Sequence, residues 1–170
     1  MRFTLIDRIL QLKAGEEITA VKTVSLAEDY LADHFPLFPV LPGVFMLEAM
    51  TQASAWLIRY TEDFAHSVVL LKEARNVKYA DFVEPGRMLT LTSKLLKEDS
   101  HTSTLKAEGA VDGKLHVSVS ARLILERYNL ADQNPEDEPN DRAALHDLRA
   151  LFALLYRPED LPPAAGQTTV

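Results

Sequence analysis

The 170-residue sequence predicts an α+β fold in which an antiparallel sheet wraps around one long, buried helix. The helix is expected over residues 43–60, which are rich in Ala, Met, Leu and Gln and are apolar around nearly the whole helical circumference. Strands are expected downstream, because four segments alternate between apolar and polar residues or are rich in β-branched residues. These segments are residues 68–79, 88–97, 102–111 and 115–126.

Two shorter strands are expected before the helix, at residues 6–12 and 18–24. The second alternates between apolar and polar side chains along its length, as a half-buried strand does. Residues 25–32 then favour a short helix with Ser25 as its N-cap, because Glu28 follows three residues later at the capping-box spacing.

The segment between this short helix and the central helix is expected to be a stiff, extended loop. It contains Pro36, Pro39 and Pro42. Each proline fixes its own φ and disfavours helical backbone at the residue before it, so the loop cannot be helical.

Turn signatures connect the downstream strands. Glu84-Pro85-Gly86-Arg87 has the composition of a type II turn, with glycine at the position that requires a positive φ. Val111-Asp112-Gly113-Lys114 contains the Asp-Gly pair that favours a tight hairpin. Short connections of this kind join neighbouring antiparallel strands, which is why the sheet is expected to be a meander.

Residues 1–128 are expected to form this domain, and an appendage is expected to follow it. Residues 129–140 are polar and acidic, which predicts a linker, and residues 141–157 predict an amphipathic helix capped by Asn140. The remaining residues, 158–170, are expected to be disordered. One apolar stripe of the helix is expected to pack on the domain or on a neighbouring protomer. Its residues are Leu145, Leu148, Phe152 and Leu155.

Composition excludes several classes of function. The formal net charge is −7, and residues 129–170 hold 3 Lys/Arg against 8 Asp/Glu, so the clustered basic residues of a nucleic-acid-binding protein are absent. The sequence has no cysteine, which excludes disulfides and thiolate chemistry. No apolar run approaches the roughly 18 residues that span a bilayer, and the charged N-terminus lacks the pattern of a signal peptide. We therefore expect a cytoplasmic protein.

Glu48 is the only charged side chain between His34 and Arg59, and it lies in an apolar run of the predicted central helix. An ionisable group that is buried without a partner costs several kcal/mol, so this acid needs either a partner or a function. A histidine and a carboxylate brought together in an apolar pocket form an acid/base pair, which makes His34 the candidate partner. A structural ion pair of Glu48 with Arg59 or Arg75 is the alternative interpretation.

The residues around this pair form a longer motif. It runs His34-Phe35-Pro36-x-x-Pro39-x-x-Pro42-Gly43-Val44-x-x-x-Glu48-Ala49-Met50-x-Gln52. The motif resembles the signature of the β-hydroxyacyl-acyl carrier protein dehydratases of the hotdog fold. The resemblance extends over residues 3–127, because Ile6-Asp7-Arg8-Ile9 and the strand-rich second half also match the family's pattern.

The resemblance implies a hotdog fold, with the C-terminal helix lying beyond the usual end of the domain. It implies a homodimer in which each active site combines the histidine of one subunit with the carboxylate of the other, and assemblies of three dimers are common in the family. The implied substrate is a (3R)-3-hydroxyacyl chain on the phosphopantetheine arm of acyl carrier protein. The implied products are the trans-2-enoyl thioester and water, in fatty-acid or related acyl-chain synthesis, with no metal or organic cofactor.

The residues of the motif suit this dehydration. The reaction needs a base for the α-proton, an acid for the leaving β-hydroxyl, and stabilisation of the charge that develops on the thioester oxygen. His34 is expected to be the base and Glu48, in apolar surroundings, the acid. Gly43 begins the helix, where unpaired N–H groups and the helix dipole can hold the thioester carbonyl. Gln52, one turn after Glu48, is placed to hydrogen-bond its carboxyl.

Apolar side chains complete the predicted substrate-binding set, which consists of Gly43, Gln52, Phe35, Phe38 and Val44. The sequence also departs from the family's pattern in two places. Asp33 replaces the usual glycine before the motif histidine, and Leu37-Phe38 replaces a common Gly-His pair. The second change makes the loop more apolar and bulky, so both changes bear on substrate preference and rate.

Two other functions stay open at this point. A hotdog acyl thioesterase would use the same fold but would activate water for attack at the thioester carbon. A catalytically weak paralogue would bind acyl chains or scaffold a synthase complex, which the altered loop and the added helix motivate. Because the carrier protein is acidic in this family, cations are candidate docking residues. These cations are Lys72, Arg75, Lys78, Arg87 and Lys97.

Overall fold

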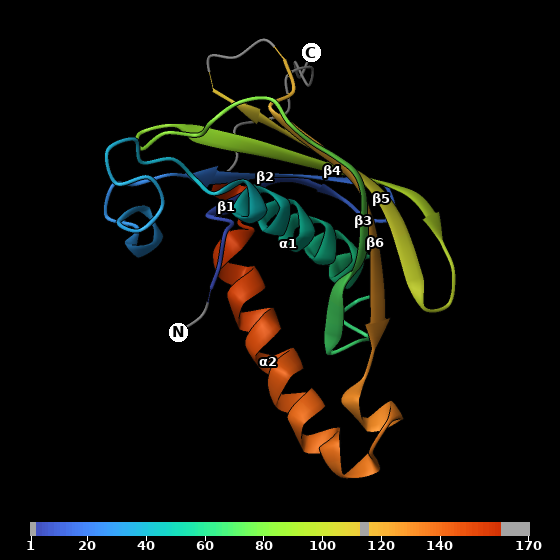
Figure 1. The fold of residues 1–170 in the computed structure, drawn as a ribbon. Helices are drawn as coiled ribbons and strands as arrows, with labels where there is room; N and C mark the ends of the chain where they lie inside the picture. The colour runs from blue at the N-terminus through green and yellow to red at the C-terminus, as the bar shows by residue number, and fades with distance from the viewer. Residues whose placement is uncertain (1–2, 113–115, 161–170) are drawn as a thin grey trace, which may run out of the picture.

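The computed structural model describes residues 3–112 and 116–160 and consists of six strands, two helices and short 3-10 turns (Figure 1). The strands are β1 (Arg8–Lys13), β2 (Glu17–Thr23), β3 (Val68–Tyr79), β4 (Met88–Glu98), β5 (Thr102–Val111) and β6 (Val119–Tyr128). The helices are α1 (Gly43–Thr61) and α2 (Glu138–Leu155), and the 3-10 turns are η1 (Asp29–Leu31), η2 (Leu130–Asp132), η3 (Pro135–Asp137) and η4 (Pro158–Asp160). The sheet is antiparallel in the order β1-β2-β4-β5-β6-β3 and curves around α1. This confirms the predicted α+β architecture.

The core lies between α1 and the concave face of the sheet. α1 buries Met46, Met50 and Leu57 almost completely, and the small side chains of Ala49 and Ala53 let the helix lie close to the strands. The sheet supplies a matching apolar layer. Its fully buried leucines are Leu89, Leu91, Leu105, Leu123 and Leu125. Burying one such side chain stabilises the fold by roughly 1.5–3 kcal/mol. Since α1 is buried on nearly every side, its position is fixed firmly relative to the sheet.

Several boundaries agree with the sequence-based predictions. β3 and β5 have the predicted bounds, and the type II turn is confirmed by a φ of +85° at Gly86. The Arg87 N–H closes this turn on the Glu84 carbonyl over 3.1 Å. β6 begins at Val119 rather than at the predicted residue 115. The predicted hairpin turn at 111–114 lies partly outside the described residues.

The short helix predicted over residues 25–32 is wrong. Only the 3-10 turn η1 forms there, with Glu28 rather than Ser25 at its N-cap position. The Glu28 carboxylate contacts the buried Lys22 ammonium at 2.5 Å, which takes this side chain away from any capping box. The Ser25 hydroxyl accepts a local bond from the Ala27 N–H instead. A short helix has few hydrogen bonds to offset the cost of nucleation, so the ion pair and the local hydrogen bond are favoured over a helix in this segment.

The C-terminal helix begins earlier than predicted. Its N-cap position is Asp137 rather than Asn140, and it ends at Leu155 rather than at residue 157. Pro139 is tolerated in the first turn because its missing N–H would have no intrahelical partner there. The predicted disordered tail lies mostly outside the described residues, and its first residues form η4. The division of the chain into domain, linker, appended helix and tail stays a prediction.

A buried carboxylate ties α2 to the domain. Asp141 accepts hydrogen bonds from the Ser67 hydroxyl and from the N–H groups of Leu130 and Ala131, the last two at 2.9 Å. Burial alone would raise the pKa of Asp141, but these bonds favour the carboxylate and hold its pKa below the usual 3.8. One side chain therefore connects α2 to the segment before β3 and to the turn after β6.

The apolar stripe of α2 packs on the domain, as the sequence predicts. Phe152 lies at the centre of an aromatic cluster, with ring centroids 5.4 Å from Phe64, 5.6 Å from Tyr60 and 5.7 Å from Trp56. Leu155 is buried in the main core. α2 is thereby held against the C-terminal half of α1 and forms one wall of the region described below.

Candidate functional site

His34 lies in the proline loop between η1 and α1. Its N–H donates to the Tyr30 carbonyl at 3.2 Å, and its ring Nδ1 is 3.0 Å from the Val40 carbonyl. A carbonyl oxygen can only accept a hydrogen bond, so Nδ1 carries the proton. The neutral ring then has its lone pair on Nε2, which is the state that a general base requires.

The backbone around His34 differs from a simple extended path. Phe35 has a φ of +53°, a left-handed conformation that is rare for a large side chain, and its carbonyl accepts from the Phe38 N–H at 2.7 Å. This turn lies at the position of Leu37-Phe38, the pair that departs from the family's pattern. Asp33 is not among the described residues with a left-handed φ, so the backbone at this position does not require glycine.

Glu48 lies in the second turn of α1, half-buried. Its Oε1 accepts a hydrogen bond of 2.9 Å from Gln52 Nε2, as the one-turn spacing predicts. The Gln52 amide is fixed in turn by the N-terminal segment: its oxygen accepts from the Leu5 N–H at 2.9 Å, and its nitrogen donates to the Phe3 carbonyl at 3.1 Å. Gln52 therefore orients one carboxylate oxygen of Glu48 and leaves the other to a ligand.

α1 begins at Gly43, and Pro42 at the N-cap position supplies no side-chain hydrogen bond to the first turn. The N–H groups of Phe45 and Met46 donate to the Pro42 carbonyl, which leaves those of Gly43 and Val44 for an oxyanion. A Cβ at Gly43 would lie 3.2 Å from Cε1 of Tyr79, a close contact that a larger side chain could make only if the ring shifted. Val44, the next residue, is 64% exposed.

The predicted substrate-binding aromatics are on the surface. Phe35 is 59% and Phe38 48% exposed, and Phe38 makes an edge-to-face contact with Phe82 at a centroid distance of 5.6 Å. We call the exposed apolar side chains of this region the loop patch. Its residues are Phe35, Leu37, Phe38, Val44 and Phe82. An exposed apolar cluster of this kind marks an interface or a ligand-binding surface.

Within one chain the structure does not bring His34 and Glu48 together. The His34 ring contacts Phe35 and the Val40 carbonyl, whereas Glu48 contacts Gln52. Among the described residues, no hydrogen bond or ion pair joins the two. Within a single protomer the predicted base and the predicted acid therefore lie apart.

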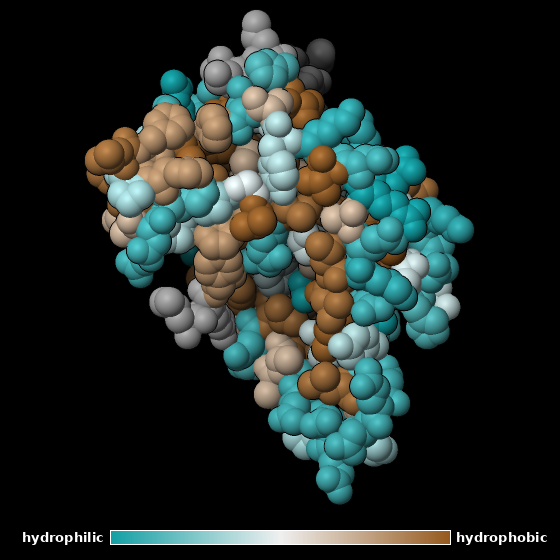
Figure 2. Space-filling model, in the orientation of Figure 1, coloured by the Kyte–Doolittle hydropathy of each residue, from teal (hydrophilic) through white to brown (hydrophobic). Residues whose placement is uncertain are grey.

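Glu48 and Gln52 open into a cavity of about 460 Å³ between α1, β3 and α2. Figure 2 shows apolar side chains gathered on this face, on either side of the hollow. The lining residues contributed by the other two elements include Val69 and Leu71 of β3 and Leu148 and Leu151 of α2. The volume is within the range typical of small-molecule sites.

The sequence-based prediction missed Arg59, which lines the same cavity. From the sequence, Arg59 is named only as the end of an uncharged stretch and as an alternative ion-pair partner of Glu48, and among the described residues no such ion pair forms. The signal that could have found it is helical spacing, since residues 48, 52, 55 and 59 follow each other at intervals of three and four along one face. The contribution of α2 could not be read from spacing, because it depends on where the appended helix packs.

The described residues contain no group of three or more His, Asp or Glu side chains arranged to hold a metal ion. None of their helices combines the length and apolar character needed to cross a bilayer.

Comparison with known proteins identifies relatives over most of the chain. The model of a family described as the FabA-like domain matches residues 1–120. A 3-hydroxyacyl-[acyl-carrier-protein] dehydratase FabZ of Lactococcus lactis subsp. cremoris (strain SK11) is 39% identical over 113 residues, which are 66% of this chain and 78% of the relative. The FabZ protein of Shewanella amazonensis is 40% identical over 116 residues, 66% of this chain and 76% of the relative.

A solved structure supports the fold. A chain of the dehydratase heterocomplex ApeI:P from Xenorhabdus doucetiae superposes with a TM-score of 0.62 at 23% sequence identity, over 79% of this chain and 90% of that chain. At this identity the similarity concerns the fold alone, and the predicted hotdog fold is confirmed. The family model ends at residue 120, so it does not extend to α2.

Proposed function

Because the chain belongs to the family described as the FabA-like domain, we propose that it is a hydro-lyase that dehydrates (3R)-3-hydroxyacyl-acyl carrier protein. The product is the trans-2-enoyl thioester, in fatty-acid or related acyl-chain synthesis, and the curated relatives are named for this reaction. The observation that carries the proposal is the hydrogen bond from His34 Nδ1 to the Val40 carbonyl. It leaves Nε2 of the neutral ring to accept the substrate's α-proton.

The reaction then proceeds between two side chains and a helix end. His34 Nε2 takes a proton from C2 of the acyl chain, and the charge that develops on the thioester oxygen is stabilised by N–H groups of the first turn of α1 near Gly43. Glu48 gives its proton to the hydroxyl on C3, which leaves as water while the C2–C3 double bond forms. Gln52 holds the other oxygen of Glu48, so the acidic proton faces the substrate.

We propose that the active protein is a homodimer in which His34 of one subunit meets Glu48 of the partner subunit. The separation of the two groups within one chain supports this arrangement, and so does the exposed loop patch beside His34. Exposure of such an apolar patch to water is unfavourable, and a second subunit that covered the patch would remove this cost. Assembly of three such dimers, and a cytoplasmic location, stay predictions from the sequence.

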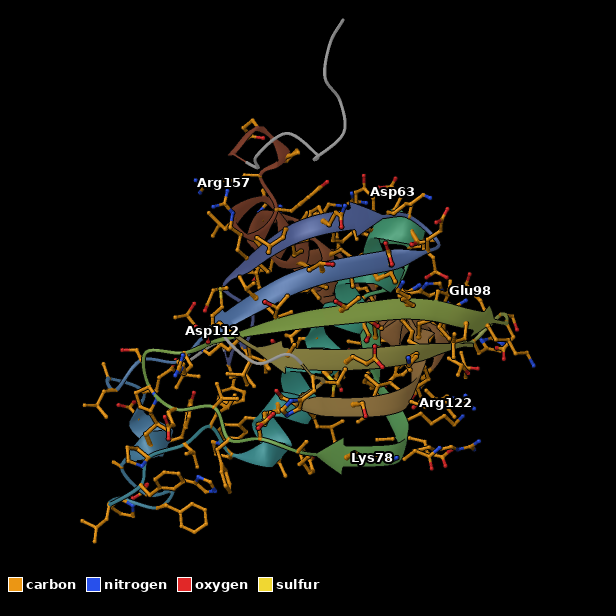
Figure 3. The ribbon with its side chains drawn as sticks, turned by 90° about the horizontal axis from the view of Figure 1, so that it is seen from above. Asp63, Lys78, Glu98, Asp112, Arg122 and Arg157 are labelled. Atoms are coloured by element: carbon orange, nitrogen blue, oxygen red, sulfur yellow. The ribbon has the colours of Figure 1, made fainter. Side chains whose placement is uncertain are left out.

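The acyl carrier protein is the proposed macromolecular partner. Of the predicted docking cations, Lys72 contacts Glu126 at 3.4 Å, Arg75 contacts Glu73 at 2.7 Å and Arg87 contacts Asp112 at 3.8 Å. These pairs are exposed and therefore weak, so an acidic partner can compete for the cations. Figure 3 shows Lys78 on the edge strand β3 with Arg122 on the neighbouring β6. This edge is the place where we expect the carrier to dock.

One assay tests the proposed function. Purified protein with 3-hydroxyacyl-carrier substrate is expected to produce enoyl absorbance. The substitutions His34→Ala and Glu48→Gln are each expected to lower the rate at least about 100-fold, the usual contribution of an acid or base. Release of free carrier thiol without enoyl product would indicate a thioesterase. Binding without any turnover would indicate the acyl-binding or scaffolding role.

A further inference from the structure

Arg59 lies on the same face of α1 as Glu48, eleven residues later in the chain. At 1.5 Å per residue their Cα atoms are about 16 Å apart along the helix axis. Both side chains line the cavity of about 460 Å³ described above. Arg59 is thus at a far end of the space that begins at the proposed acid.

The Arg59 side chain is partly buried, and among the described residues its positive charge has no ionic partner. The guanidinium carbon lies 5.3 Å from the centre of the Trp56 ring, and Nη2 donates to the Val69 carbonyl at 3.3 Å. The buried Nε has no hydrogen-bond partner. Burial lowers the pKa of Arg59 to about 10, and among the described residues no carboxylate lies within ion-pair distance. A cation that is largely removed from water and has no ionic partner is costly, so an anion that entered the cavity would be held strongly.

Between its two polar ends the cavity is mostly apolar. Val69 and Leu71 form one side and Leu148 and Leu151 of α2 form another. Asp147 of α2 also lines the cavity. An elongated apolar space with Glu48 and Gln52 at one end and an unpaired cation at the other fits a chain that is apolar along its length and polar at its far end.

We infer that this cavity receives the acyl chain of the substrate and that Arg59 selects chains that carry a carboxylate at the end distant from the thioester. The inference rests on the proposed dehydratase function and specifies its substrate class. The Cα separation of about 16 Å sets an upper scale of roughly a dozen carbons, because an extended chain advances about 1.2 Å per bond and the Arg59 side chain reaches back over Trp56. A chain that ended in a methyl group would leave the Arg59 Nε unpaired and would remove water from it.

The test compares two carrier-bound substrates of equal length, 3-hydroxydodecanoyl and 3-hydroxydodecanedioyl, which differ only in the terminal methyl or carboxylate. Unsubstituted protein is expected to favour the carboxylate by at least about tenfold in kcat/KM, a difference of about 1.4 kcal/mol. Arg59→Met, which keeps an unbranched stem but removes the charge, is expected to abolish the preference. Arg59→Lys, which keeps the charge, is expected to retain part of it.

Two controls make the result decisive. Asp147→Asn is expected to leave the preference equal or larger, because it removes an acid from the same cavity; loss of the preference in this variant would overturn the inference. The inference would also be overturned if unsubstituted protein preferred the methyl-terminated chain, or if a folded Arg59→Met variant kept the preference for the carboxylate. Circular dichroism and thermal unfolding establish that each variant is folded.

Binding separates this inference from the proposed function. Titration calorimetry with the His34→Ala variant measures the affinity for both substrates without turnover. Stronger binding of the dicarboxylic chain, together with no turnover by unsubstituted protein, would support the selectivity of the cavity and reject the dehydratase. Turnover of both chains with equal affinity and equal kcat/KM would support the dehydratase and reject the role of Arg59.

Discussion

At the scale of single residues, the hydrogen bond of His34 decides which ring nitrogen is left to act as the proposed base. The motif predicts the histidine itself but not its tautomer, because the Val40 carbonyl comes within 3.0 Å only through the path of the intervening loop. The bond between Gln52 and Glu48 was accessible to sequence reasoning, since it spans one helical turn. The contacts that fix the Gln52 amide could not be predicted in this way, because they come from a segment nearly fifty residues away.

Gly43 yields a prediction at this scale. Its φ is not left-handed, so only space limits a substitution there, and that space is taken by the Tyr79 ring at 3.2 Å from an added Cβ. Gly43→Ala is expected to destabilise the protein by about 1–3 kcal/mol through overpacking. Urea unfolding measures this loss.

The matched control for this prediction is the double variant Gly43→Ala with Tyr79→Ala, which removes the ring that the new methyl group meets. We expect the two substitutions to be coupled by at least about 0.5 kcal/mol, so that Gly43→Ala costs less in the Tyr79→Ala background. Equal costs in both backgrounds would show that the ring is not the reason for glycine.

At the scale of elements, the docking of α2 depends on pH through Asp141. Its pKa is lowered in the folded protein, so the carboxylate contributes stability above the unfolded value near 3.8, and this contribution is lost as the pH falls through the lower, folded value. Protonation places a hydrogen on one carboxylate oxygen and removes the negative charge, which weakens the bonds from the Ser67 hydroxyl and from two N–H groups. Hydrogen exchange of the α2 amides is expected to accelerate below about pH 4 relative to the α1 amides.

Asp141→Asn is the control for this pH dependence. The amide keeps the shape but cannot titrate, so α2 is expected to exchange faster than in unsubstituted protein at pH 7 and to change little at lower pH. If unsubstituted protein and the variant showed the same acid dependence, another group would be responsible.

The aromatic cluster gives a second prediction for α2. Phe152 contacts Trp56, Tyr60 and Phe64, whereas Leu154 on the same helix is 63% exposed. Phe152→Ala is expected to cost about 2–3 kcal/mol, less than a fully buried phenylalanine because the ring is only partly buried. Leu154→Ala is expected to stay within about 0.5 kcal/mol. Similar losses in thermal unfolding for both variants would contradict the packing described.

The elements also show where local pattern suffices and where it does not. β3 and β5 have their predicted bounds because alternation and β-branched residues extend to their ends. The predicted helix at 25–32 fails because Lys22, buried in β2, draws the Glu28 side chain into an ion pair. A capping pattern takes account only of hydrogen bonds between neighbouring residues. Here an ion pair with a residue of β2 takes the Glu28 side chain away from the cap.

At the scale of the whole molecule, one protomer contains both proposed catalytic groups but holds them apart, and its loop patch is exposed beside one of them. The proposed active site therefore needs two copies of the chain. The sequence predicts this only through the family resemblance, since no local pattern states how two copies meet. A symmetric dimer of this kind has two equivalent sites, each built from both subunits.

Subunit complementation tests this claim most directly. A heterodimer of one His34→Ala subunit and one Glu48→Gln subunit, isolated with two different affinity tags, has one site with both substitutions and one site with neither. It is expected to recover about half of the dehydratase activity of the unsubstituted dimer, although each homodimeric variant is inactive. A heterodimer as inactive as either homodimeric variant would place His34 and Glu48 of each site in the same chain and contradict the account.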